Sequence, residues 1–152
     1  MLMLIVMLFW GCTLLAQPNK KIDSLKIELK KDKIDKFQDY KALFNVFAVN
    51  QDPVNQKMIA YEYFNYALKS KDNSTIAKSK IIIAWYFYHK MDLKKALATL
   101  SEALILANKS NNNYTIGLVY SYICNIYYLM NDYSSLILAS AYTSLFKDAI
   151  IP

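Results

Sequence analysis

The chain has 152 residues and carries 18 basic and 12 acidic side chains, giving a formal net charge of +6. With only 2 glycines, 3 prolines and 2 cysteines, the composition excludes collagen-like, disordered and disulfide-scaffold proteins. A single histidine also excludes a dense Cys/His metal site, so we expect neither a metal nor a cofactor.

The first element in the chain, residues 1–16, has the pattern of an export leader. Residues 1–10 are uninterrupted apolar sequence, and the first charge is Lys20. This stretch is too short to cross a bilayer, which takes about 20 residues, but it suits the apolar core of a secretory signal cleaved after Ala16. No basic residue precedes it, which is atypical. We predict export to the periplasm or cell envelope.

Two alternatives for the leader stay open. In a lipoprotein signal Cys12 would be acylated and would tether the chain to a membrane, whereas in a mature globular chain the same residues would form a buried N-terminal helix. Cleavage after Ala16 would leave Cys124 as the only cysteine, so the fold would rest on its core without an internal disulfide.

Residues 17–36 are predicted to form a lysine-rich amphipathic helix. Ile22, Leu25 and Leu29 recur at helical spacing, and the other positions are mostly charged. Because acidic residues are interspersed with the lysines, this pattern favours a solvated helix surface over a phosphate-binding stripe. Arginine is absent, which removes the commonest specific contact to guanine. We therefore expect no nucleic-acid partner.

The rest of the chain predicts a series of helices separated by polar turns. The spacing between helix-breaking residues is about fifteen residues, and hairpin turn signatures are missing, which favours helices over strands. Asp92 and Asp132 occupy positions suited to capping the helix that follows each. The expected helices cover residues 35–49, 55–69, 75–89, 93–107, 115–129 and 133–147.

Residues 85–93 align with residues 125–133 at an offset of 40 positions. A large–small pair precedes each segment, and after the first one Ala96 and Ala103 bracket Leu100. This pattern resembles the tetratricopeptide (TPR) repeat, although Met91 and Asn131 replace its turn glycine. The resemblance covers residues 37–148 as about three repeats, namely 37–70, 77–107 and 117–148.

The resemblance implies an all-α fold in which antiparallel helix pairs stack as a short right-handed solenoid with a concave groove. A generic helical bundle is the alternative. Residues 136–151 form an apolar end without the polar cap that a terminal repeat needs, so we expect a partner or a missing C-terminal segment to cover them.

The leader, the lysine-rich helix and the repeats together resemble the N-terminal periplasmic region of Bacteroidetes-type TPR-containing sensor proteins. This implies the sensory or docking part of an envelope signalling protein. The alternatives are a membrane-tethered TPR lipoprotein with a structural or assembly role, and a fragment of a TPR-containing transcriptional regulator.

The sequence favours a protein or peptide partner over an enzymatic reaction. There is no glycine-rich phosphate loop, and Cys124 occupies a small-residue packing position. By analogy with TPR geometry, helix-A side chains line the partner-binding groove, and their flat rings suit an extended peptide or a helix. The candidate groove residues are Lys78, Ile81, Trp85, Tyr88 and His89 in one repeat and Ser121, Asn125 and Tyr128 in the next.

Overall fold

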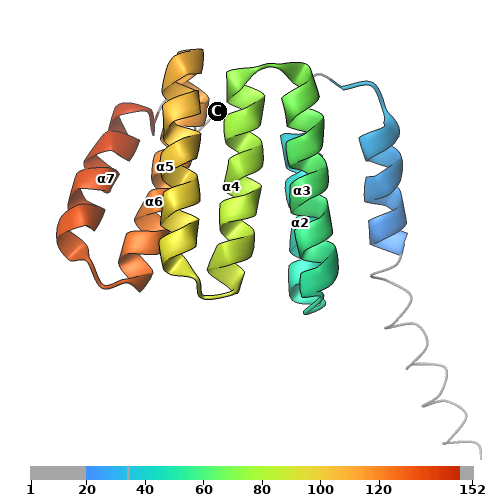
Figure 1. The fold of residues 1–152 in the computed structure, drawn as a ribbon, viewed down its shortest axis with the longest axis horizontal. Helices are drawn as coiled ribbons and strands as arrows, with labels where there is room; N and C mark the ends of the chain where they lie inside the picture. The colour runs from blue at the N-terminus through green and yellow to red at the C-terminus, as the bar shows by residue number, and fades with distance from the viewer. Residues whose placement is uncertain (1–19, 34, 148–152) are drawn as a thin grey trace, which may run out of the picture.

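The computed structural model describes residues 20–33 and 35–147, which form helices joined by short turns and contain no strand. The predicted all-α fold is thereby confirmed. After a helical segment at residues 20–30, the chain forms α2 (Phe37–Val49), α3 (Pro53–Ser70), α4 (Asn73–His89), α5 (Leu93–Ser110), α6 (Asn113–Leu129) and α7 (Tyr133–Leu145) (Figure 1).

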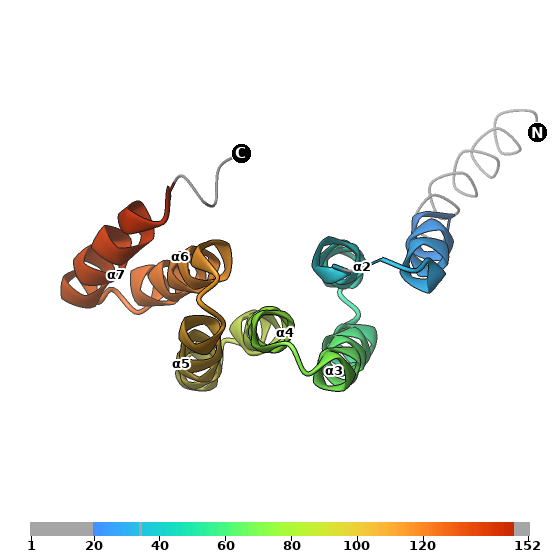
Figure 2. The same cartoon turned by 90° about the horizontal axis from the view of Figure 1, so that it is seen from above.

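Successive helices run antiparallel and stack side by side as a helical-repeat solenoid (Figure 1). Figure 2 shows the stack as an arc, with α2, α4 and α6 on its inner side. Helix α4 contacts both α2 and α6, whereas among the described helices α3, α5 and α7 contact only their neighbours in sequence. The inner layer is therefore continuous, and its exposed surface crosses three helices.

The turns follow a strict spacing. A residue with left-handed backbone conformation occurs once every 20 positions, and the residue after it caps the next helix with its side chain. The left-handed residues are Gln51, Lys71, Met91, Asn111 and Asn131. The caps are Asp52, Asp72, Asp92, Asn112 and Asp132.

Two kinds of turn alternate, so the full unit is 40 residues. Within a pair, the cap residue also closes the preceding helix: the Asp92 amide donates to the Phe87 carbonyl at 3.0 Å, and the equivalent Asp132 amide does so to Tyr127 at 3.0 Å. Between pairs, the Ser110 hydroxyl donates to the Ala107 carbonyl at 2.7 Å, a bond repeated at Ser70. Turns that lie 40 residues apart in the sequence therefore have the same hydrogen bonds.

Small side chains let the helices approach closely. Ala96 and Ala103 of α5 and Ala84 of α4 are buried, while large side chains such as Leu100 and Ile82 fill the space beside them. This is the distribution that the repeat pattern predicts.

Three of the six helices α2–α7 begin two residues earlier than the sequence analysis expected. Helix α3 starts at Pro53 rather than at residue 55, because Asp52 accepts a hydrogen bond from the Asn55 amide at 3.0 Å and proline suits the first helical position. Helices α4 and α6 likewise start two residues before the expected 75 and 115, after the caps Asp72 and Asn112.

The lysine-rich segment departs further from expectation. Its helix ends at residue 30 instead of continuing through residue 36. Lys36 donates to the Leu29 carbonyl at 2.7 Å, and Asp35 accepts from the Phe37 amide at 2.9 Å, so the connection folds back and starts α2. The leader 1–16, with Cys12, lies outside the described residues. Within the described residues, none of the helices combines the length and apolar character needed to cross a membrane.

Candidate functional site

Three aromatic side chains gather on one face of α4. Trp85, Tyr88 and His89 are spaced so that a helix places them together. The rings of Trp85 and Tyr88 stack with centroids 4.4 Å apart and planes 7° apart, and His89 meets Trp85 edge-on at 5.6 Å. This geometry fixes the flat surfaces relative to one another.

The aromatic cluster extends to both neighbouring inner helices. Tyr122 of α6 meets Trp85 edge-on at 5.1 Å, and Phe44 of α2 lies 5.8 Å from His89, measured between ring centroids. We call these five residues, Phe44, Trp85, Tyr88, His89 and Tyr122, the inner aromatic cluster. Phe44 is fully buried, whereas the others reach the surface.

The inner aromatic cluster is uncharged at neutral pH. Burial lowers the pKa of His89 from its usual 6.5, so the imidazole is mostly neutral at pH 7. Burial, reinforced by the nearby Tyr114, raises the pKa of Tyr122 to about 12. A partner of this surface therefore meets rings and neutral hydrogen-bonding groups.

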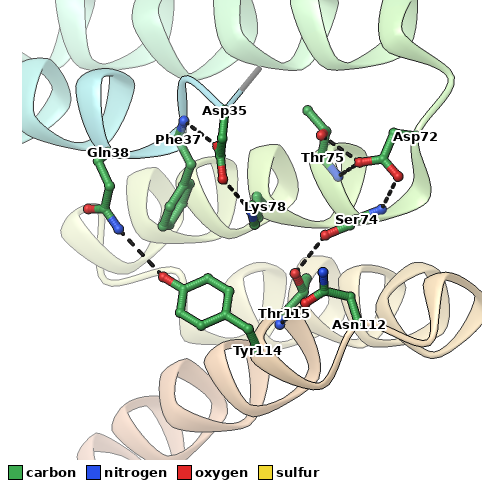
Figure 3. A network of polar contacts seen from close by, with 10 residues as sticks. All are labelled: Asp35, Phe37, Gln38, Asp72, Ser74, Thr75, Lys78, Asn112, Tyr114 and Thr115. Atoms are coloured by element: carbon green, nitrogen blue, oxygen red, sulfur yellow. Dashed lines mark hydrogen bonds and ion pairs between the residues drawn. The ribbon is translucent and has the colours of Figure 1, made fainter. Parts of the chain in front are cut away.

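A network of polar side chains lies near the start of α4 (Figure 3). Lys78 is only 7% exposed, and its ammonium group lies 2.5 Å from the Asp35 carboxylate and 5.4 Å from the centre of the Tyr114 ring. The buried charge is thus paired and lies against an aromatic ring, and it joins the start of α2 to α4 and α6.

Two further bonds complete this network. The hydroxyls of Ser74 and Thr115 are buried and lie 2.7 Å apart, joining the starts of α4 and α6 (Figure 3). The Gln38 amide donates to the Tyr114 hydroxyl at 3.5 Å. These contacts hold the three inner helices in register, so they support the aromatic surface and do not form a reactive centre.

The structure brings together three of the predicted groove residues and separates the others. Trp85, Tyr88 and His89 lie in one cluster, as described. Ile81 is fully buried in the core and Lys78 is held in the polar network, so neither offers free surface to a partner. The Ser121 hydroxyl donates to the Leu118 carbonyl of its own helix at 2.7 Å.

The remaining two predicted residues, Asn125 and Tyr128, are exposed on α6, Tyr128 at 62%. Asn125 lies 40 residues after Trp85, and Asn45 on α2 lies 40 residues before Trp85. Both asparagines are exposed. The sequence analysis missed Asn45 and Tyr122; extending the 40-residue alignment back to α2 would have found Asn45.

The described residues do not include a group of three or more His, Cys, Asp or Glu side chains arranged to hold a metal ion. Cys124 is half-buried, with its sulfur 3.7 Å from the Thr143 hydroxyl. This environment matches the packing position expected from the sequence.

The fold defines the chain as an all-α helical-repeat protein. Comparison with models of known families, with curated proteins and with solved structures found no match.

Proposed function

We propose that this chain is a non-enzymatic scaffold of TPR type that binds a protein or peptide along the inner face of α2, α4 and α6. The observation that carries the proposal is the inner aromatic cluster, in which rings from three helices form one uncharged surface. Stacked rings supply contact area with few rotatable bonds, so ordering them on binding costs little entropy.

Two exposed asparagines add hydrogen-bonding capacity beside the rings. Asn45 and Asn125 occupy the positions on α2 and α6 that Trp85 occupies on α4. A primary amide has two donors and an acceptor, which match the N–H and C=O groups of an extended peptide backbone. The expected ligand is therefore a peptide segment whose side chains contact the rings while its backbone contacts the amides.

Selection from a random peptide library displayed on phage, with the full chain as bait, tests this proposal. We expect enriched peptides to bind at least about fivefold more weakly to Tyr88→Ala or Asn125→Ala variants, because removing a central contact of this kind commonly costs about 1 kcal/mol or more. Tyr61→Ala, on the outer helix α3, is the control and leaves affinity unchanged. Peptides that bind all three variants equally would place the binding surface elsewhere.

We further propose that the scaffold is exported and serves as the sensory or docking part of an envelope signalling protein. The apolar leader supports this proposal. N-terminal sequencing of the chain expressed in a Gram-negative host should start at Gln17, and an intact Met1 on cytoplasmic protein would contradict export. Fatty-acid labelling that disappears in Cys12→Ala would instead identify the tethered lipoprotein.

A further inference from the structure

A pocket of about 290 Å³ lies where the turn between α2 and α3 meets the end of α4. It adjoins the inner aromatic cluster, because His89 belongs to both. Its lining residues are Ala48, Gln51, Pro53, Gln56, His89 and Lys90.

The pocket contains a buried polar group without a partner. Gln56 is 5% exposed, and its side-chain amide nitrogen is buried without a hydrogen-bond partner in the described part of the chain. An unpaired buried donor is unfavourable, and most buried polar groups in proteins are hydrogen-bonded. The Gln56 amide is therefore a donor available to a ligand that enters the pocket.

Comparing the pocket residues with the equivalent residues of the next repeat unit shows whether the fold itself requires polar side chains there. The residues one 40-residue unit later include neither a charged side chain nor a side-chain amide: Tyr88, Met91, Leu93, Ala96, Leu129 and Met130. Ala96, which corresponds to Gln56, is fully buried and packs without any polar contact. The helix pair thus folds with alanine at this position, and the polar side chains gather at only one of the two equivalent places.

Lys90 supplies a cation at the pocket. Lys90 is exposed and takes part in none of the ion pairs found among residues 20–33 and 35–147. Of the neighbouring carboxylates, Asp92 pairs with Lys95 at 2.8 Å. Asp52 keeps its negative charge and accepts hydrogen bonds from Asn55.

We propose that this pocket binds a carboxylate of the peptide partner, with the Gln56 amide and the Lys90 ammonium as donors. The inference rests on the proposed function and names the chemistry of its ligand. A carboxylate accepts charge-assisted hydrogen bonds from both groups, and it is the common anionic group of peptides. His89 joins the pocket to Trp85 and Tyr88, so the residue next to the acid lies on the aromatic rings.

Titration of the isotope-labelled full chain with small probes tests the pocket directly by NMR. The probes are N-acetylglycine, which has a terminal-type carboxylate, acetylglutamate amide, which has a side-chain carboxylate, and neutral N-acetylglycinamide. We expect saturable shifts of the Gln56 side-chain amide and of the only histidine ring with at least one carboxylate, and none with the neutral probe. The carboxylate probe that binds more tightly shows whether the pocket prefers a C-terminal or a side-chain carboxylate of the peptide.

Two variants replace a pocket residue with the residue found 40 positions later in the chain. Gln56→Ala and Lys90→Met, matching Ala96 and Met130, should each weaken carboxylate binding about tenfold, as loss of a charge-assisted hydrogen bond does. Lys94→Met, an exposed lysine of α5, is the matched control and should leave binding unchanged. Circular dichroism confirms that each variant is folded.

The outcomes separate this inference from the proposed function. Absence of saturable shifts at the pocket, or shifts that inorganic phosphate alone produces, would overturn the carboxylate site. Library peptides that bind the inner face without acidic residues and independently of Lys90 would also overturn it, while the scaffold function stands. If a carboxylate probe binds the pocket but the library selection enriches no peptide, both the peptide source of the carboxylate and the scaffold function would be overturned.

Discussion

Single residues set the ends of the helices. Asn112 accepts a hydrogen bond from the Thr115 amide at 2.9 Å and so satisfies one of the free amides at the start of α6. The same role falls to an aspartate at the other four turns, where the carboxylate of Asp132, for example, has a pKa lowered by its bonds to Ser135. Each helix therefore starts at a specific side chain.

Asn112→Ala should lower the free energy of unfolding by about 1 kcal/mol, because the Thr115 amide loses its acceptor. Asn112→Asp keeps an acceptor and should retain most of the stability. Urea denaturation followed by circular dichroism measures both. Asn113→Ala, at an exposed neighbouring position, should change stability far less, and an equal loss there would argue against capping as the cause.

His89 gives the folded chain a dependence on pH. Its pKa is lowered below 6.5 in the folded state because burial favours the neutral ring. The unfolded chain therefore binds a proton more readily, and stability should fall as pH drops from 6.5 through the folded-state pKa. NMR titration of this single histidine and urea denaturation across that range check the prediction. His89→Gln should remove the slope; a slope that persists would belong to other groups.

The sequence predicts only part of the candidate site at this scale. Helical spacing alone brings Trp85, Tyr88 and His89 together. The same spacing places Ile81 on that side of α4, yet Ile81 is fully buried in the core. The contribution of Tyr122 likewise depends on the approach of α6, which no local pattern specifies.

At the scale of elements, the turns contain residues whose backbone conformation is unfavourable. Met91 and Asn131 both have left-handed conformations, with φ of 57° and 56°. This conformation is unfavourable for a residue with a side chain, less so for asparagine, and not for glycine. These two turns thus adopt a left-handed conformation without a glycine.

Met91→Gly should stabilise the chain by about 0.5–1 kcal/mol, because it relieves this strain and the 69% exposed side chain contributes little packing. Asn131→Gly should gain less. Thermal unfolding compares the two variants. Met130→Gly is the control: its φ is −78°, so glycine there should destabilise, and a gain at Met130 would show that left-handed strain is not the cause.

The sequence predicts the C-terminal ends of the inner helices better than the starts of most helices. The end of α2 at Val49 and that of α4 at His89 match the expectation. The start of α3 was expected late because Pro53 was interpreted as a stop for the preceding helix, whereas it is also the first residue of α3. The run of caps at 20-residue intervals was present in the sequence and would have placed these starts.

At the scale of the whole molecule, the C-terminal end of the stack exposes an apolar helix. Helix α7 has no charged residue, and Ala139 is its only buried one, whereas Ile137, Leu138 and Leu145 are exposed. This agrees with the apolar end expected at residues 136–151, of which 148–151 lie outside the described residues. That a partner covers this end stays a prediction.

Because α7 contacts only α6 among the described helices, it should open more easily than α4, which is packed between α2, α3, α5 and α6. Hydrogen exchange measured by mass spectrometry should show α7 amides exchanging well before those of α4. Protection of α7 equal to that of α4 at high dilution would contradict this and show that the helix is held by contacts beyond one face.

The regular spacing of the turns makes the solenoid modular. The stretch from Asp72 to Asn111 begins with one cap and ends just before the next, and it contains a complete helix pair. A duplicate of this stretch, spliced in ahead of Asn112, would leave the flanking caps intact and lengthen the arc by one pair. Duplication in steps of 40 residues thus gives such a chain a simple route to longer binding surfaces, on which the inner side chains of each added copy can diverge independently.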